Sequence, residues 1–198
     1  MSRRVAVFAR EPRIGHVKTR LAADIGEAKA LDCYTKTLEI AIQAASNQAL
    51  ELWYEGNPAS SWIERRLHLK EQPAGSLGNR MLSAFCDGVD IVIGSDIPLI
   101  TNSYVDRAAE LLTFVDVVLG PTEDGGYCLI GMRRALPELF EGVTWSSTQV
   151  LGATLRNAKR QNLRVELLAP LWDIDDATGY DRWISMQNEN SAQCAQSA

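Results

Sequence analysis

The sequence is poor in the residues that build soft-metal sites and disulfide frameworks. It has only two histidines, His16 and His68, too few for a metal site built from histidine, and we expect both to lie on the surface. Its four cysteines lie far apart and show no C-x-x-C spacing, which argues against a zinc site or a disulfide framework. These are Cys33, Cys86, Cys128 and Cys194. We therefore expect reduced thiols.

Long apolar runs and an excess of positive charge are also missing. Two arginines near the N-terminus precede only five apolar residues, Val5 to Ala9, too few for a signal-peptide core or a membrane span. We therefore expect a cytoplasmic protein with no membrane span. The formal net charge of −5 argues against a general nucleic-acid binder, because neutralising phosphates needs a concentrated Lys/Arg surface. A small phosphorylated ligand needs only a local basic pocket, so it stays compatible with this charge.

The apolar residues are arranged as in an α/β protein. Short β-branched runs alternate with longer stretches of helical spacing, the pattern of βαβ units around a mainly parallel sheet. The expected strands are 4–9, 50–54, 90–94, 116–119, 127–130 and 164–168, and the expected helices are 28–45, 60–67, 77–86, 103–112 and 148–161. The link from 119 to 127 is too short for a crossover helix, which favours an antiparallel or offset strand there. We predict a three-layer α/β/α sandwich with a mixed, mainly parallel sheet.

Length and composition indicate a single domain. At 198 residues, with 46% apolar and 23% charged residues, the chain can bury one full core. The last ten residues are polar and small. We therefore predict one domain over residues 1–188 and a flexible tail over 189–198.

The first candidate site follows the first expected strand, in the segment FAREPRIGHVKTRLA. It combines a flexible backbone at Gly15 with three cations, Arg10, Lys18 and Arg20. A glycine-containing loop at the carboxyl end of a strand presents N–H groups and positive charge to an anion such as phosphate. The alternative is an ordinary turn with solvated basic residues, because the spacing matches neither Walker A nor G-x-G-x-x-G.

The second candidate is Asp96 in the segment GSDIPLI, directly after a strand that is expected to be buried. A carboxylate there lies at the carboxyl edge of the sheet, where open α/β folds bind ligands, and it can offer oxygen to Mg²⁺ or Mn²⁺. The alternative is capping of the next helix, although Thr101 or Asn102 can already serve that purpose.

Two further acidic segments follow. In GPTEDGGYCLIGM, Asp124 precedes Gly125 and Gly126, which let the backbone approach a ligand, although Asp-Gly is also a turn signal. In LWDIDDATGYDRW, Asp173 and Asp175 face the same side if the segment is extended, so that their repulsion favours a bound cation or a nearby Lys/Arg. The alternative there is capping of the last helix by Asp175 or Asp176.

Assembled in order, these segments resemble the GT-A-like family of nucleotide-diphospho-sugar transferases, also called selenodomain-associated transferase-like glycosyltransferases. The likeness spans almost the whole chain. It rests on ARxPxxGxVKTRL at 9–21, GxLGxRM at 75–81, GSDIP at 94–98, GPxEDGGYxLIGM at 120–132, WSS at 145–147 and DID at 173–175. The layout more distantly resembles phospholactate, phosphoenolpyruvate and molybdenum-cofactor guanylyltransferases.

The resemblance implies a role for each matching residue. The residues it assigns to the nucleotide are Ala9, Arg10, Gly15, Lys18, Arg20, Gly78 and Arg80. Asp96 and Asp175 would hold Mg²⁺ or Mn²⁺, and Lys18 and Arg20 would stabilise developing phosphate charge. Asp124, Gly125, Gly126 and Trp145 would form the acceptor or sugar side, where Asp124 is the candidate base and Trp145 can stack on a base or sugar.

Three functions follow as hypotheses. The favoured one is a metal-dependent glycosyltransferase that moves a sugar from a nucleotide sugar to a small-molecule acceptor. The second is a nucleotidyltransferase that releases pyrophosphate from a nucleoside triphosphate. The third is a nucleotide-binding module without turnover, motivated by Ser76, where relatives often have aspartate, and by Gly179, where they often have an acidic residue.

Overall fold

The computed structural model describes the backbone of residues 2–196 and the side chains of residues 2–189. The strands are β1 (Arg4–Arg10), β2 (Ala49–Glu55), β3 (Leu69–Glu71), β4 (Ile91–Ile93), β5 (Val117–Pro121), β6 (Tyr127–Met132) and β7 (Val165–Leu167). The helices are α1 (Thr19–Ile25), α2 (Glu27–Ala44), α3 (Ser60–Glu64), α4 (Leu77–Cys86), α5 (Asn102–Leu111), α6 (Val150–Arg160) and α7 (Ala177–Gln196), with a 3-10 turn η1 (Pro137–Phe140).

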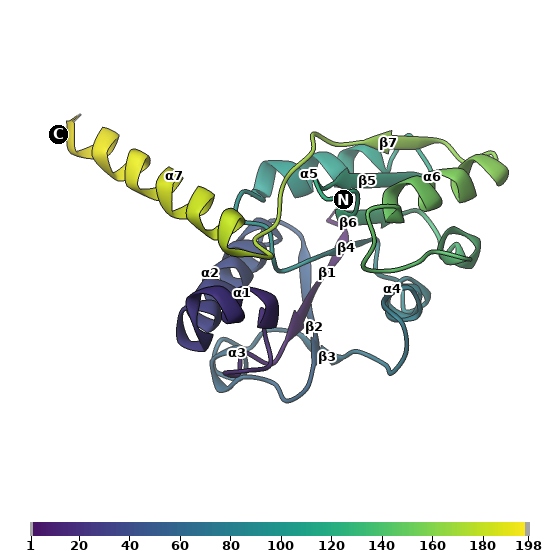
Figure 1. The fold of residues 1–198 in the computed structure, drawn as a ribbon. Coiled ribbons are helices and arrows are strands. Elements are labelled where there is room, and N and C mark those ends of the chain that lie inside the picture. The colour runs from purple at the N-terminus through teal and green to yellow at the C-terminus, as the bar shows by residue number, and fades with distance from the viewer. Residues whose placement is uncertain (1, 197–198) are drawn as a thin grey trace.

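The seven strands form one mixed sheet in the order β3-β2-β1-β4-β6-β5-β7 (Figure 1). Strand β6 runs antiparallel to both of its neighbours, whereas the other pairs are parallel. The short β5–β6 connection therefore acts as expected, because it reverses the chain instead of crossing over the sheet. The mixed, mainly parallel α/β sheet that the sequence predicts is confirmed.

Alternation along the strands supplies two apolar faces. On β1, Val5 and Val7 join one buried cluster with side chains of α2 and α5, while Ala6 and Phe8 join another with side chains of α4 and η1. Successive side chains of a strand point to opposite faces, so that one strand serves both clusters. Helices therefore cover both faces of the sheet, and the three-layer arrangement is present.

Three elements differ from the expectations. The short edge strand β3 was not expected, because its three residues, Leu69–Glu71, carry no alternating apolar pattern. A separate helix α1 precedes α2, and Gly26 (φ 88°) joins the two. Helix α7 continues to Gln196, so most of the segment expected to be a tail has helical backbone; residues 197–198 lie outside the described residues.

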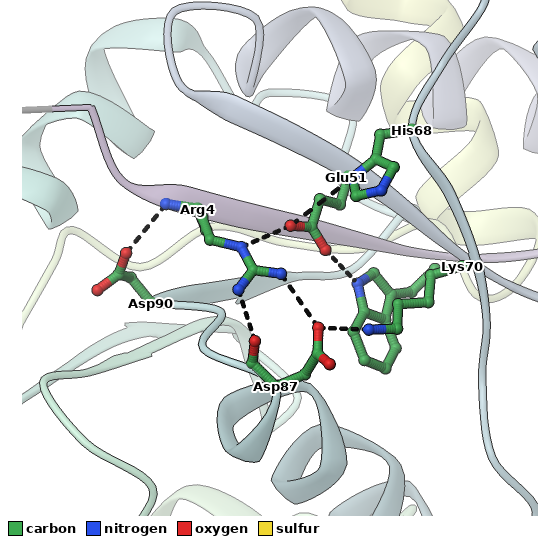
Figure 2. A network of polar contacts seen from close by, with 7 residues as sticks. Arg4, Glu51, His68, Lys70, Asp87 and Asp90 are labelled. Atoms are coloured by element: carbon green, nitrogen blue, oxygen red, sulfur yellow. Dashed lines mark hydrogen bonds and ion pairs between the residues drawn. The ribbon is translucent and has the colours of Figure 1, made fainter.

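A polar network ties the first two strands to the end of α4 (Figure 2). The Glu51 side chain, only 4% exposed, accepts hydrogen bonds from Arg4 Nε at 2.7 Å and Trp53 Nε1 at 3.0 Å. Burial raises the pKa of Glu51, but these hydrogen bonds outweigh burial and the net pKa is lowered. Arg4 Nη2 and Lys70 also pair with Asp87. The network therefore keeps a buried carboxylate ionised and fixes the strand ends opposite the candidate site.

In residues 2–196, no helix has both the length and the apolar character that crossing a membrane requires.

Candidate functional site

The loop between β1 and α1 is held by residues on both sides. Tyr34 of α2 accepts a hydrogen bond from Arg10 N at 2.7 Å and donates one to Arg10 O at 3.0 Å, which fixes the end of β1. Val17 and Leu21 are buried. Between these anchors Gly15 and Lys18 both take positive φ, 76° and 50°. The loop is therefore an anchored turn whose unusual backbone sets the direction of the Lys18 side chain.

Lys18 joins three segments that lie far apart in the sequence. Its Nζ is 2.5 Å from Asp96 Oδ1, 2.5 Å from the Ile174 carbonyl oxygen and 4.0 Å from Asp175 Oδ1. The backbone N–H of Ile174 also donates to the Asp96 carbonyl at 3.2 Å. The two residues expected to bind metal and the lysine expected to bind phosphate therefore meet at one point.

Two other predicted cations, Arg10 and Arg80, meet at Glu55. Arg10 Nε is 3.2 Å and Arg80 Nη1 is 2.8 Å from Glu55 Oε2, so the two arginines share one carboxylate. Arg80 Nη1 also donates to Gln72 Oε1, and Gln72 Nε2 donates to the Ala9 carbonyl. Sequence reasoning missed Gln72 and Glu55. The position of Glu55 directly after the expected strand 50–54 was an available signal, whereas Gln72 follows β3, which the sequence did not predict.

Gly78 and Trp145 lie in direct contact. A Cβ added to Gly78 would lie 2.6 Å from Cζ2 of Trp145, so the glycine makes room for the indole ring. Ser76 caps α4, because its side chain accepts a hydrogen bond from Asn79 N at 3.3 Å. Ser76 thus fills the N-cap position that an aspartate would also suit.

The β5–β6 turn places Asp124 at an exposed position. Its Oδ1 accepts hydrogen bonds from Thr122 Oγ1 at 2.5 Å and from Gly126 N at 3.0 Å. Gly125 has φ 88°, and a Cβ there would lie 2.2 Å from the Thr148 carbonyl oxygen. The turn interpretation of this segment therefore holds, and one oxygen of Asp124 is committed to the turn.

The aspartates of the segment 173–176, after β7, have different contacts. Asp176 caps α7 by accepting a hydrogen bond from Gly179 N at 2.9 Å, which leaves Asp175 to face Lys18 and Arg20. A Cβ at Gly179 would lie 3.1 Å from the Asp173 carbonyl oxygen, so a larger side chain would crowd this turn. The capping alternative thus applies to Asp176 and not to Asp175.

Negative charge accumulates around Asp173. Burial, followed by the charges of Asp124 and Asp175, raises the pKa of Asp173 to about 6. The positive charges nearby do not compensate these carboxylates fully. Arg20 reaches Asp175 Oδ2 at 3.3 Å, but its side chain is 78% exposed and therefore well screened by solvent.

The donor set fits a hard divalent cation. Two carboxylates, Asp96 and Asp175, converge on the Lys18 ammonium, and carboxylate oxygen is the donor that Mg²⁺ and Mn²⁺ prefer. In the part of the chain that the structure describes, no group of three or more His, Cys, Asp or Glu side chains is placed to hold a metal. A cation held by these two carboxylates would complete its coordination with water or with oxygen atoms of a ligand such as a phosphate.

Comparisons with known proteins agree with this architecture. A family model described as "Uncharacterized protein conserved in bacteria (DUF2064)" matches residues 28–147. A solved structure from Desulfovibrio desulfuricans G20, described as a "putative nucleotide-diphospho-sugar transferase", is 30% identical, with 89% of this chain and 84% of that chain covered and a TM-score of 0.78. Among curated proteins, no sequence matched.

Two more distant structures share the fold. CMP:2-keto-3-deoxy-manno-octonic acid synthetase complexed with CTP is 12% identical, with 95% of this chain and all of that chain covered and a TM-score of 0.53. The 4-diphosphocytidyl-2C-methyl-D-erythritol synthase of Anaerococcus prevotii DSM 20548 is 6% identical, with 94% and 99% covered and a TM-score of 0.59. At these identities the likeness concerns the fold alone.

Proposed function

We propose that this chain, which belongs to the bacterial family described as DUF2064 through the match at residues 28–147, is a metal-dependent transferase with a nucleotide-sugar donor. The observation that carries this proposal is the meeting of Lys18, Asp96 and Asp175 at the carboxyl ends of β1 and β4. Open α/β sheets bind ligands at this edge. The description of the 30% identical relative from Desulfovibrio desulfuricans points to the same donor class.

In this proposal the cations of the first loop bind the diphosphate. Lys18 and Arg20 lie next to the paired carboxylates, and Arg10 lies beside Arg80 near the N-terminal part of α4. Gly78, close to Arg80 in sequence, contacts Trp145, whose ring would stack on a base or sugar in this proposal. Phosphate and the rest of the nucleotide would therefore contact separate groups of residues.

Glycosyl transfer then needs charge stabilisation and a proton acceptor. A bound Mg²⁺ or Mn²⁺ supplies neutralisation of the diphosphate charge. Asp96 and Asp175 would hold that cation, while Lys18 and Arg20 would stabilise the charge that develops on the leaving nucleoside diphosphate. Asp124 receives the proton of a small-molecule acceptor through Oδ2, because Oδ1 is engaged by the turn.

Nucleotidyl transfer is the second candidate. An incoming phosphate or carboxylate attacks the α-phosphorus, and pyrophosphate leaves, so that no protein base is required. The observation that favours it is the double use of Asp124 Oδ1 in the turn, which leaves this carboxylate only one oxygen for proton transfer. A third candidate, a module without turnover, loses support because Ser76 and Gly179 both have structural roles.

The test is the substitution Asp96→Asn, with Asp32→Asn as the matched control. Asp32 is an exposed residue of α2 that pairs with Lys36. Both variants should keep the fold, and only Asp96→Asn should lose turnover by at least about 100-fold, because it removes a charged cation ligand. Product analysis then distinguishes nucleoside diphosphate from pyrophosphate. Equal turnover in wild type and Asp96→Asn would contradict the proposed role.

A ligand screen identifies the donor class. Nucleoside triphosphates and sugar nucleotides are each added with and without Mn²⁺, and the melting temperature is recorded. A ligand that binds only the native state at 100 times its Kd stabilises it by about 2.7 kcal/mol. A metal-dependent shift with a sugar nucleotide alone supports glycosyl transfer, and one with a triphosphate alone supports nucleotidyl transfer.

A further inference from the structure

The Lys18 ammonium occupies the point toward which the site's oxygen atoms are directed. Its Nζ lies 2.5 Å from Asp96 Oδ1 and 2.5 Å from the Ile174 carbonyl oxygen, with Asp175 Oδ1 at 4.0 Å. An ammonium has three N–H donors and here faces three oxygen atoms. Each of these oxygen types is also one that Mg²⁺ or Mn²⁺ would take.

The side chain is enclosed, unlike those of the other cations in the loop. The Lys18 side chain is 4% exposed, whereas that of Arg20 is 78% exposed and that of Arg10 is 59% exposed. A buried charge must be paired, and the two close oxygen contacts provide that pairing. Lys18 is therefore an integral part of this site.

The backbone commits Lys18 to this position. Its φ of 50° lies in the left-handed region, which residues with a side chain rarely adopt. Strained backbone of this kind persists only where surrounding contacts hold it, and such strain gathers at functional sites. Here the buried neighbours Val17 and Leu21 hold the two sides of the turn.

We propose that Lys18 is an internal counter-ion that keeps the carboxylates of Asp96 and Asp175 from binding a divalent cation until a phosphate-bearing ligand arrives. This inference rests on the proposed function, since it assigns an order of binding to that same site. The ammonium and the cation compete for the same oxygen lone pairs and repel each other at this distance. Both do not occupy this point together.

The oxygen atoms of a bound phosphate would end the competition between the Lys18 ammonium and the cation for the carboxylates. They would accept hydrogen bonds from the ammonium and draw Nζ away from Asp96, and they would add oxygen ligands for the cation beyond the two carboxylates. Cation and nucleotide therefore raise each other's affinity, because such coupling between two ligands is reciprocal. Lys18 is the residue through which this coupling acts.

The test is the affinity for Mn²⁺ alone, with no nucleotide present, followed through the electron paramagnetic resonance signal of free Mn²⁺. The variants are Lys18→Met and, as the charge-matched control, Lys36→Met, because Lys36 is an exposed residue of α2 that pairs with Asp32. Lys18→Met should bind Mn²⁺ at least tenfold more tightly than wild type, and Lys36→Met less than threefold more tightly. Equal gains in both variants would show only a general change of charge and would overturn the inference.

Two additions keep the outcome decisive. Lys18→Gln removes the charge but keeps a donor for the Ile174 carbonyl, so it replaces Lys18→Met if the latter melts at a much lower temperature. Adding Asp96→Asn to the Lys18 variant should abolish the gain. A wild-type affinity that already equals that of the variant would overturn the inference.

The result is separate from that of the transfer assay. A tighter Mn²⁺ site in Lys18→Met together with no transfer in wild type would reject the proposed reaction and keep the counter-ion role. Transfer by the wild type, together with no gain of Mn²⁺ affinity in Lys18→Met, would support the proposed reaction and reject the counter-ion role.

Discussion

Replacing Gly125 by Ala tests whether the turn that presents Asp124 is as tightly packed as the structure indicates. The new Cβ would lie 2.2 Å from the Thr148 carbonyl oxygen, 2.8 Å from its carbonyl carbon and 3.0 Å from its Cα. All three are backbone atoms, so no side-chain rotation relieves the contact. Leu151 N donates to Gly125 O at 3.0 Å, which ties the same two segments together.

Two costs add up in this variant. The φ of 88° is unfavourable for alanine and costs about 1–2 kcal/mol. Overpacking against a backbone that must shift by about 1 Å costs about 1–3 kcal/mol more. The free energy of unfolding should therefore fall by about 2–5 kcal/mol, which lowers the melting temperature by about 4–20 °C.

The assay is urea unfolding followed by tryptophan fluorescence, with Gly142→Ala as the control. Gly142 also has positive φ, 64°, but a Cβ there meets nothing within 4 Å, so only the backbone cost of about 1–2 kcal/mol applies. The difference between the two variants isolates the contact with Thr148. If the two lose the same stability within about 0.5 kcal/mol, the close packing of this turn is refuted.

Two further substitutions address the rest of the fold. Glu51→Gln should lower the free energy of unfolding by about 1–3 kcal/mol at pH 7, because it weakens the bonds from Arg4 and Trp53. The folded pKa of Glu51 is lowered, so its contribution is present above the ordinary glutamate pKa and is lost as the pH falls through the folded value. Urea titrations of wild type and variant should therefore converge in acid; a gap that stays constant to about pH 3 would contradict this. Tyr104→Phe removes the 2.8 Å bond to the Ala169 carbonyl and should cost about 0.5–1.5 kcal/mol, measured as a shift in the urea midpoint.

Local patterns in the sequence predicted six of the seven strands and most helices, but not the order of the strands in the sheet. The apolar run at 4–9 predicted a strand whose side chains alternate between two buried faces. Strand β1 has this arrangement. The five residues between β5 and β6 are too few for a crossover helix, which specified the reversal. The sequence did not predict strand β3, because a three-residue strand at the edge of a sheet needs no alternating apolar pattern.

The residue types of the site were also visible in the sequence, as cations after β1 and aspartates after β4 and β7. Side-chain type and position at a strand end depend on neighbours along the chain, so the sequence specified them. The sequence did not specify how these groups pair. Lys18 contacts Asp96 and Ile174, which lie 78 and 156 residues further along the chain. The tertiary structure also decided between helix capping and ligand binding in the DIDD run. Asp176 accepts a hydrogen bond from its own helix, α7. Asp175 faces Lys18, in a loop from the other end of the chain. The sequence by itself thus determined which groups are available, and only the tertiary structure decided that an ammonium lies among the carboxylates, since Coulomb interactions depend on distance in space and not along the chain.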